Sequence, residues 1–240
     1  MRKIYTIALL LISLSGTLRS QHVDSVAVRI SAMKDNASKI FSWINEANKI
    51  SSSAPKRAFD YVENGLELAL ILNNKRGEAY CYNSLGALNY SLNSYSASIN
   101  NYEKARALFA GEESEKGYYN TMKYIGAAYE GDHQLDQAAK YYKLFNDLAI
   151  LKGDKDDEVY AINALARIYY SQKEYLQSKV AYDTILQIEQ SRNNPVGIID
   201  ATNNLGNVYE AINDSTGAFE MYNQSYQMAN DIGDVERANS

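Results

Sequence analysis

The stretch Thr202–Tyr209 reads Thr-Asn-Asn-Leu-Gly-Asn-Val-Tyr, and three earlier stretches align with it without gaps. They are Tyr82–Asn89, Met122–Tyr129 and Ile162–Tyr169, and each carries Leu or Ile followed by a small residue. The small residue falls at positions 86, 126, 166 and 206, so the step from one stretch to the next is constant. A constant step across four stretches indicates an internal repeat.

The second half of each unit repeats with the same step. A tyrosine recurs four times, and a small residue stands four positions before it: Tyr102, Tyr142, Tyr182 and Tyr222 follow Ser98, Ala138, Ser178 and Ala218. Polar turn residues separate the halves of a unit, as at Asn93-Ser94, and separate consecutive units, as at Gly153-Asp154. Each unit is therefore predicted to form two amphipathic helices of about 15–18 residues joined by a tight turn.

These residue types have a physical reason. Two helices that cross in a hairpin approach closely at one point, and a Gly or Ala in the first helix with a small residue in the second permits that approach. Leu85 and its counterparts Ile125, Leu165 and Leu205 are predicted to fill the space around it. Because one hairpin cannot bury its apolar face alone, successive hairpins are expected to stack around a continuous core.

The pattern resembles the tetratricopeptide repeat (TPR) family. In one unit it is carried by Tyr82, Leu85, Gly86, Ser98, Tyr102 and Ala105, and in another by Thr202, Leu205, Gly206, Tyr209, Ala218, Tyr222 and Ser225. The resemblance implies an all-α, right-handed superhelical solenoid of antiparallel helix pairs. Its units have about 40 residues, whereas the basic unit of the family has about 34. The extra residues fall at the junctions between hairpins, and the terminal proline of the family pattern is absent.

The repeats define the domain organisation. Four units are predicted at residues 79–118, 119–158, 159–198 and 199–238, after an N-terminal leader at 21–36 and a degenerate capping repeat at 37–78. Atypical end units are expected, because the outer face of a terminal hairpin meets water. Residues 239–240 are expected to start a further, truncated repeat, so the sequence is interpreted as a fragment of a longer protein.

The first twenty residues have a different composition. Arg2 and Lys3 form a basic start, Ile4–Leu14 is apolar, and small residues follow at Ser15 and Gly16. This layout predicts a secretory signal peptide over residues 1–20 and an exported protein of bacterial type, periplasmic or on the cell surface. The alternative is an uncleaved anchor, although the apolar run is shorter than the about 20 residues that span a bilayer. No membrane span is predicted in the rest of the chain.

Charge and composition narrow the function. The net charge is −5, and it becomes −8 without Arg2, Lys3 and Arg19. An acidic chain without a basic cluster is a poor candidate for binding nucleic acid or an anionic membrane surface, so neither is expected as a partner. Cys81 is the only cysteine, so no internal disulfide can form, and it is expected to be an inert helix residue.

No catalytic constellation is present in the sequence. The two histidines, His22 and His133, lie far apart, and no metal-ligand spacing, nucleophile elbow or phosphate loop occurs. The acidic run Asp154–Glu158 lacks the glycine and the spacing of a calcium loop, and is interpreted as a solvated junction. The chain is therefore predicted to be no enzyme and to bind no cofactor.

Outward positions of the first helix recur once per unit and are predicted to line the concave side of the solenoid. They are Asn83, Lys123, Asn163 and Asn203, with Arg167 and Asn207 beside them and Tyr80 and Tyr160 one turn earlier. An asparagine amide both donates and accepts, so it can pair with a peptide backbone in either direction, and tyrosine supplies a flat anchoring surface. In TPR proteins such Asn and Lys residues grip an extended peptide, and the resemblance implies that role here. The alternative is a solvated helix face.

The sequence therefore predicts a protein- or peptide-binding module outside the cytoplasm. Its favoured setting is the N-terminal sensor region of a larger signalling protein, a histidine kinase or a transcriptional regulator, in which case any kinase activity lies beyond residue 240. The alternative is a free-standing periplasmic or surface scaffold for protein assembly. A cytoplasmic peptide-pheromone receptor also uses such repeats, but the predicted signal peptide at residues 1–20 argues against it.

Overall fold

The computed structural model describes residues 24–111 and 115–238. The predicted signal peptide and the predicted start of a further repeat at 239–240 lie outside the described residues. Within the described ranges every regular element is a helix: α2 (Ser25–Ser31), α3 (Ala37–Ile50), α4 (Pro55–Ile71), α5 (Lys75–Ser91), α6 (Tyr95–Gly111), α7 (Glu115–Gly131), α8 (Leu135–Lys152), α9 (Lys155–Ser171), α10 (Tyr175–Ser191), α11 (Pro195–Ala211), α12 (Ser215–Asp231) and α13 (Val235–Ala238).

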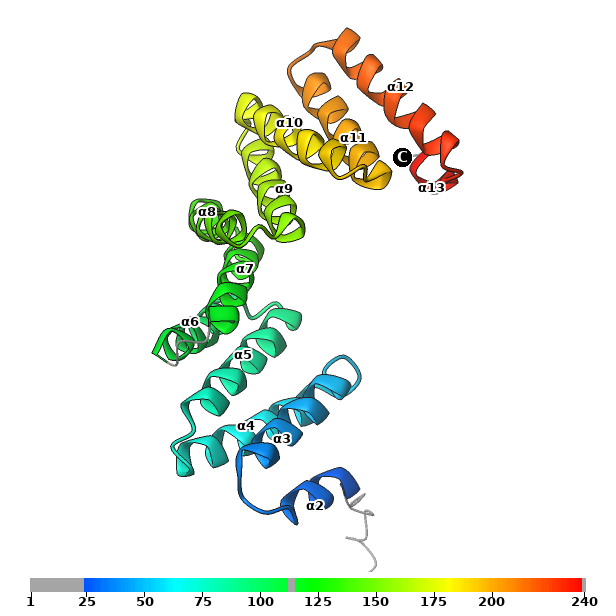
Figure 1. Cartoon of the computed structure of the whole chain (residues 1–240). Helices are drawn as coiled ribbons and strands as arrows, with labels where there is room; N and C mark the ends of the chain where they lie inside the picture. Colours follow the sequence, from blue (N-terminus) through cyan, green and yellow to red (C-terminus); the bar gives the residue numbers. More distant parts are fainter. Residues whose placement is uncertain (1–23, 112–114, 239–240) are drawn as a thin grey trace, which may run out of the picture.

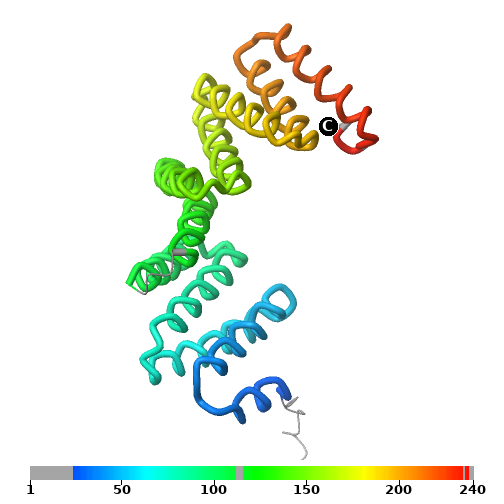
Figure 2. The backbone as a smooth tube through the Cα atoms, in the orientation of Figure 1, coloured from blue at the N-terminus to red at the C-terminus, as the bar shows by residue number. Residues whose placement is uncertain are grey.

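From α3 onward the helices form consecutive hairpins, α3–α4 to α11–α12, and each helix packs against the helix before it and the helix after it. The first helix of a hairpin is called the A helix and the second the B helix. Successive hairpins wind along one axis, from α3 near one end to α12 near the other (Figures 1 and 2). The A helices α3 and α5 contact each other, and so do α5 and α7; the surface that the A helices form is called the inner surface. The predicted all-α solenoid of antiparallel helix pairs is confirmed.

The A helices begin at Lys75, Glu115, Lys155 and Pro195, four residues before the predicted unit boundaries at 79, 119, 159 and 199. The first turn of each A helix contains few of the repeated residues, because its residues serve to start the helix. Side chains at the N-cap do this directly: Asn74 accepts from the Gly77 amide at 2.8 Å, and Asp154 accepts from the Asp157 amide at 3.1 Å. The same capping precedes α13, where Asp234 accepts from the Arg237 amide.

The turns repeat with half the period of the hairpins. From the end of α4 onward, each described turn has a residue in the left-handed conformation at the same place: Asn73, Asn93, His133, Gly153, Lys173, Asn193, Asn213 and Gly233. At each one, two backbone bonds close the end of the helix, as where Asn73 donates to Leu70 and Asn74 to Ala69. The residue that follows the left-handed one is already the N-cap position of the next helix, so these connections are about as short as helices allow. The extra residues of the unit therefore lie in the helices, and the prediction that they fall at the junctions between hairpins is wrong.

The glycines of the repeat mark the predicted close approach within a hairpin. A Cβ atom on Gly86 would lie 2.6 Å from the Tyr102 ring, and one on Gly206 would lie 2.5 Å from the Tyr222 ring. The tyrosine of each of these B helices therefore packs directly on the backbone of its A helix. The large apolar residues that precede the small position, such as Leu85 and Ile125, are buried as predicted.

Two further predictions concern single residues. Cys81 is fully buried in the core at the N-terminal end, and burial raises the pKa of its thiol to about 12, so the thiolate that would make it reactive is disfavoured. His133 lies exposed in a turn between an A and a B helix, as predicted. Across residues 24–111 and 115–238, no helix combines the length and the apolar character that crossing a membrane requires.

Candidate peptide-binding groove

The structure places all eight predicted groove residues on A helices. Tyr80 and Asn83 lie on α5, Lys123 on α7, Tyr160, Asn163 and Arg167 on α9, and Asn203 and Asn207 on α11. The three asparagines of the main row are half-buried, whereas Arg167 and Asn207 are exposed. The row therefore forms part of the inner surface, but its members differ in what they contact.

Lys123 is held by the chain itself. Its ammonium group lies 3.2 Å from Asp157 of the next A helix and 3.8 Å from the centre of the Tyr160 ring. An ion pair and a cation–π contact together fix this side chain between two hairpins. Lys123 and Tyr160, which were predicted as separate contacts for a peptide, are thus each other's partners.

Arg167 is held in a similar way. Its guanidinium donates to Glu130 of the preceding A helix at 3.0 Å, and Glu130 also accepts from the Tyr142 hydroxyl at 2.8 Å. Burial and the neighbouring Glu130 raise the pKa of Tyr142 above its ordinary value, so the hydroxyl stays protonated and donates. The two predicted cations of the groove are therefore both neutralised within the fold.

Tyr80 serves packing between hairpins. Its ring makes edge contacts with Phe41 of α3 at 5.5 Å and with Phe109 of α6 at 5.1 Å between ring centres. Edge-to-face pairs of this kind stabilise a core. Tyr80 thus contacts the hairpin before its own as well as its own B helix, and offers only part of its ring to the inner surface.

Hairpins two places apart share features that the alignment of single units missed. In α5–α6 and α9–α10, two tyrosines at the turn meet edge to face: Tyr90 with Tyr95 at 5.6 Å, and Tyr170 with Tyr175 at 5.4 Å. In the same two hairpins a B-helix serine donates to the carbonyl at the small position, as Ser178 does to Ala166 at 3.0 Å.

The other two hairpins, α7–α8 and α11–α12, have a glutamate at the position of Tyr90, namely Glu130 and Glu210. At these positions the sequence therefore repeats with every second unit. This longer period can be read from the sequence itself.

An open hollow lies on the inner surface between α9 and α11. It has a volume of about 290 Å³ and is lined by Arg167, Tyr170, Tyr182, Asn204 and Asn207. A second hollow of about 240 Å³ adjoins it, because Tyr182 and Asn204 line both. The lining of the second hollow includes Asn163 and Asp200.

The hollows bring together three of the predicted residues, Asn163, Arg167 and Asn207. Asn203 lines neither of them; its neighbour Asn204 lines both. Sequence reasoning missed Asn204, Tyr170 and Tyr182. Tyr182 was noted only as a repeat position, and the choice between Asn203 and Asn204 depends on helix rotation, which a repeat alignment does not give.

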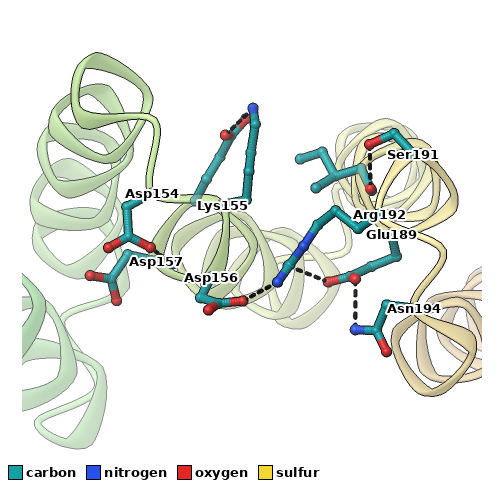
Figure 3. A network of polar contacts seen from close by, with 10 residues as sticks. Asp154, Lys155, Asp156, Asp157, Glu189, Ser191, Arg192 and Asn194 are labelled. Atoms are coloured by element: carbon teal, nitrogen blue, oxygen red, sulfur yellow. Dashed lines mark hydrogen bonds and ion pairs between the residues drawn. The ribbon is translucent and has the colours of Figure 1, made fainter.

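A charged network fixes the wall of the second hollow at the junction of α10 and α11 (Figure 3). Arg192 contacts Asp156 at the start of α9 and lies 3.3 Å from Glu189, and Asn194 donates to Glu189 at 2.8 Å. Glu189 is only 3% exposed. It has room because Gly197 stands opposite, where a Cβ atom would lie 2.5 Å from the Glu189 carboxyl carbon. The helices α9, α10 and α11 are therefore tied together beside the groove.

No cluster of three or more His, Cys, Asp or Glu side chains that could hold a metal ion occurs among the residues the structure describes. What the inner surface offers is hydrogen bonding and aromatic contact. Around the hollows, amide groups and tyrosine rings surround an open space, and Arg167 already has an acidic partner. Such an arrangement offers hydrogen bonds and flat aromatic contact to a polypeptide segment.

Comparisons with known proteins agree with this architecture. Residues 157–231 match the family model of the tetratricopeptide repeat. BtubC (BKLC) from P. vanneervenii has a TM-score of 0.69 at 17% identity, with 86% of this chain and 83% of that chain covered. YrrB, a TPR protein with an unusual peptide-binding site, has a TM-score of 0.57 at 21% identity, with 90% and 96% covered. The fold is thus that of a TPR solenoid.

A third structure is the STAND protein PH0952 from Pyrococcus horikoshii, which has a tetratricopeptide repeat sensor. Its TM-score is 0.76 at 15% identity, and the match covers 89% of this chain and 33% of that chain. A comparison with curated protein sequences gives no match. The findings support a helical-repeat fold of the TPR type, which is typical of protein-binding modules.

Proposed function

We propose that this chain is a protein-interaction module that binds an extended peptide segment along its A helices, with the hollows between α9 and α11 as the centre of the site. The observation that carries the proposal is the convergence of Asn163, Asn204 and Asn207 with two tyrosines on an open space. Amides can pair with a peptide backbone in either chain direction, and tyrosines are frequent anchors in interfaces.

The charge pairing on the inner surface favours an uncharged segment. Lys123 is bound to Asp157 and Arg167 to Glu130, so a carboxylate of the partner would have to displace an existing ion pair. Displacement leaves the abandoned acid without its partner, which offsets the gain. Recognition therefore rests on backbone hydrogen bonds and on apolar or aromatic side chains.

We further propose that the module acts outside the cytoplasm, as the N-terminal sensor or interaction region of a larger signalling protein. The support is the basic start, apolar run and small residues of residues 1–20, which have the layout of an export signal. A free-standing periplasmic or surface scaffold is the alternative. The likeness to a protein with a TPR sensor agrees with the first setting but shows the fold alone.

Selection of a random peptide library displayed on phage against the purified protein tests the binding function. Selected peptides are then titrated against a groove variant in which Asn163, Asn204 and Asn207, the asparagines of the hollows, are all changed to Ala. A matched control changes three exposed asparagines away from the row, Asn48, Asn100 and Asn223, to Ala. The groove variant is expected to lose at least about tenfold in affinity, equal to about 1.4 kcal/mol, and the control to bind normally.

Circular dichroism and thermal melting of both variants show whether each remains folded. If the folded groove variant binds all selected peptides as tightly as the control does, the asparagines of the hollows do not form the binding surface and the proposal is wrong.

A further inference from the structure

The hollow between α9 and α11 has a counterpart two repeat units earlier in the chain. A joint is defined here as a B-helix tyrosine together with the inner-surface residues around it. The C-terminal joint consists of Tyr182, Tyr170, Arg167, Asn204 and Asn207, and the N-terminal joint consists of the residues at the same repeat positions, Tyr102, Tyr90, Ala87, Tyr124 and Ala127. The first two positions are tyrosine in both joints, and the other three positions differ.

In the N-terminal joint the space over the B-helix tyrosine is filled from within the chain. The Tyr124 ring stacks on the Tyr102 ring, with centres 5.5 Å apart and planes 24° apart. Tyr124 is 38% exposed, so its ring lies at the inner surface and closes the joint there. The position of Tyr124 is that of Asn204 in the C-terminal joint, and an asparagine has no ring to stack.

The small position of the A helix also differs. The N-terminal joint has Gly86, on which a Cβ atom would lie 2.6 Å from the Tyr102 ring, whereas the C-terminal joint has Ala166 with a real Cβ atom. Atoms do not approach that closely, so Tyr182 cannot take the place relative to α9 that Tyr102 takes relative to α5. An absent ring and a displaced tyrosine together account for the open hollow.

The polar groups at the rim of the hollow are arranged for a neutral ligand. The Tyr222 hydroxyl lies within hydrogen-bond distance of two side-chain oxygens, that of Asn207 at 2.8 Å and that of Glu210 at 3.1 Å. The first contact orients the Asn207 amide and leaves its NH₂ group as a donor. Arg167 is directed to Glu130. An anionic side chain would therefore meet a cation that is already paired, while a ring with a hydroxyl would meet amides.

We infer that the C-terminal joint is a pocket for an aromatic side chain, tyrosine or phenylalanine, of the bound polypeptide segment. The ring occupies the space over Tyr182 that Tyr124 occupies over Tyr102 in the other joint, and Asn204 and Asn207 contact its edge or the adjoining backbone. The stacking of Tyr124 on Tyr102 in the N-terminal joint thus resembles the contact that the partner's ring makes with Tyr182 in the C-terminal joint. This inference rests on the proposed function, because it assigns one residue of the segment that lies along the A helices.

Capped amino acids test the pocket directly. N-acetyl-tyrosinamide, N-acetyl-phenylalaninamide and N-acetyl-leucinamide are titrated into the ¹⁵N-labelled protein, and the side-chain amide signals of Asn204 and Asn207 are followed by NMR. The two aromatic probes are expected to shift these signals in a saturable way, with at least threefold tighter binding than the leucine probe. Equal binding of all three probes, or no saturable shift at these two residues, overturns the inference.

Two variants give the matched comparison. Asn204→Tyr supplies the missing ring, so it is expected to fill the hollow, abolish the response at Asn207 and keep or raise the melting temperature. Tyr124→Asn empties the N-terminal joint and leaves the C-terminal one unchanged, so the shifts at Asn204 and Asn207 are expected to persist. A folded Asn204→Tyr protein that still binds the aromatic probes with unchanged shifts at Asn207 contradicts the pocket.

The inference and the proposed function can fail separately. If selected peptides lose affinity in the groove variant but bind Asn204→Tyr as tightly as the original protein, the groove stands and the aromatic pocket is wrong. If the aromatic probes bind at Asn204 and Asn207 while no selected peptide loses affinity in the groove variant, the pocket exists but the extended-peptide function is wrong.

Discussion

The N-terminal and C-terminal joints use the same helix hairpin in two ways. Around Tyr102 the neighbouring hairpin supplies a tyrosine ring, Tyr124, and the joint becomes part of the packed core. Around Tyr182 the neighbouring hairpin supplies Asn204, and the joint remains open to the inner surface. Differences at two repeat positions, Tyr124 against Asn204 and Gly86 against Ala166, therefore separate a structural contact from a candidate binding site, although the helices and turns around both are alike.

The same contrast appears where one hairpin meets the next. At the junction of α6 and α7, Phe109 packs over Gly117, while the equivalent junction of α10 and α11 places Glu189 over Gly197 and ties it to Arg192 and Asn194. In both cases a glycine on the A helix makes room for a large B-helix residue. The first junction is thus stabilised by apolar burial, and the second, which lies beside the hollows, by polar contacts.

The largest expected effect comes from emptying the apolar junction. Phe109→Ala removes a fully buried ring from between α5, α6 and α7, so the free energy of unfolding is expected to fall by about 3–5 kcal/mol. Glu189→Ala removes a polar contact instead, so a loss of about 1–3 kcal/mol is expected. Urea denaturation followed by circular dichroism measures both. Equal losses would mean that the two junctions are stabilised in the same way.

The position of the small residue in the A helix, which is Gly86 in the N-terminal joint and Ala166 in the C-terminal joint, offers a sharper comparison. Gly86→Ala forces the Tyr102 ring away from α5, and the expected loss of stability is about 1–3 kcal/mol. Ala166→Gly in the C-terminal joint involves no clash, so it is expected to cost only about 1 kcal/mol through the lower helix propensity of glycine. If Gly86→Ala is neutral in urea denaturation, the close packing that distinguishes the joints is absent.

The stabilisation by the two B-helix tyrosines, Tyr102 and Tyr182, is expected to depend differently on alkaline pH. Burial raises the pKa of Tyr102 above the ordinary value of 10.0, and it also raises that of Tyr182, where the positive charge of Arg167 opposes the shift. The unfolded chain ionises these phenols near pH 10 and the folded chain does not, so their stabilisation is complete below pH 10 and is lost as the pH rises further. Each such tyrosine contributes a slope of up to about 1.4 kcal/mol per pH unit there.

Tyr102→Phe is therefore expected to reduce the alkaline loss of stability more than Tyr182→Phe does. Urea denaturation between pH 9 and pH 11.5 measures the two slopes. The reverse order would contradict the opposing effect of the Arg167 charge on Tyr182.

The smallest effect concerns the turns. Lys173 and Asn93 stand at equivalent turn positions, and both have a positive φ, 62° and 56°. Asparagine tolerates this conformation better than lysine does, and glycine adopts it freely. Lys173→Gly is expected to raise the free energy of unfolding by about 0.5–1 kcal/mol, and Asn93→Gly by less. Thermal melting detects the difference; a destabilised Lys173→Gly would show that the left-handed turn is not strained.

The repeat step alone was enough to predict the hairpins, their turns and the close approach of the two helices at the small residues, because these features depend on positions that recur in every unit. The contacts that the groove residues make within the chain could not be predicted in the same way. Lys123 and Arg167 were expected to be available to a ligand, but their partners Asp157 and Glu130 lie in neighbouring hairpins. Which side chains meet across hairpins depends on helix rotation and superhelical pitch.

At Asn204 in the C-terminal joint, too, a repeat alignment does not reveal what the side chain contacts. Asn204 and Tyr124 align, and only the packing of α7 and α11 on their neighbours reveals that one leaves a space which the other fills. The two-unit period that relates them is present in the sequence. A comparison of alternate units identifies Asn204 as a departure next to the tyrosines that both joints share, Tyr90 and Tyr170.

The most direct test of the binding site is photo-crosslinking. A library-selected peptide carrying benzoylphenylalanine in place of its aromatic residue is irradiated with the protein, and the attachment sites are mapped by mass spectrometry. The crosslinks are expected on α9 and α11, at residues that line the hollows around Tyr182 and Asn204, and to disappear in Asn204→Tyr. Crosslinks concentrated on the B helices or around Tyr102, and unchanged in that variant, would contradict the proposed site.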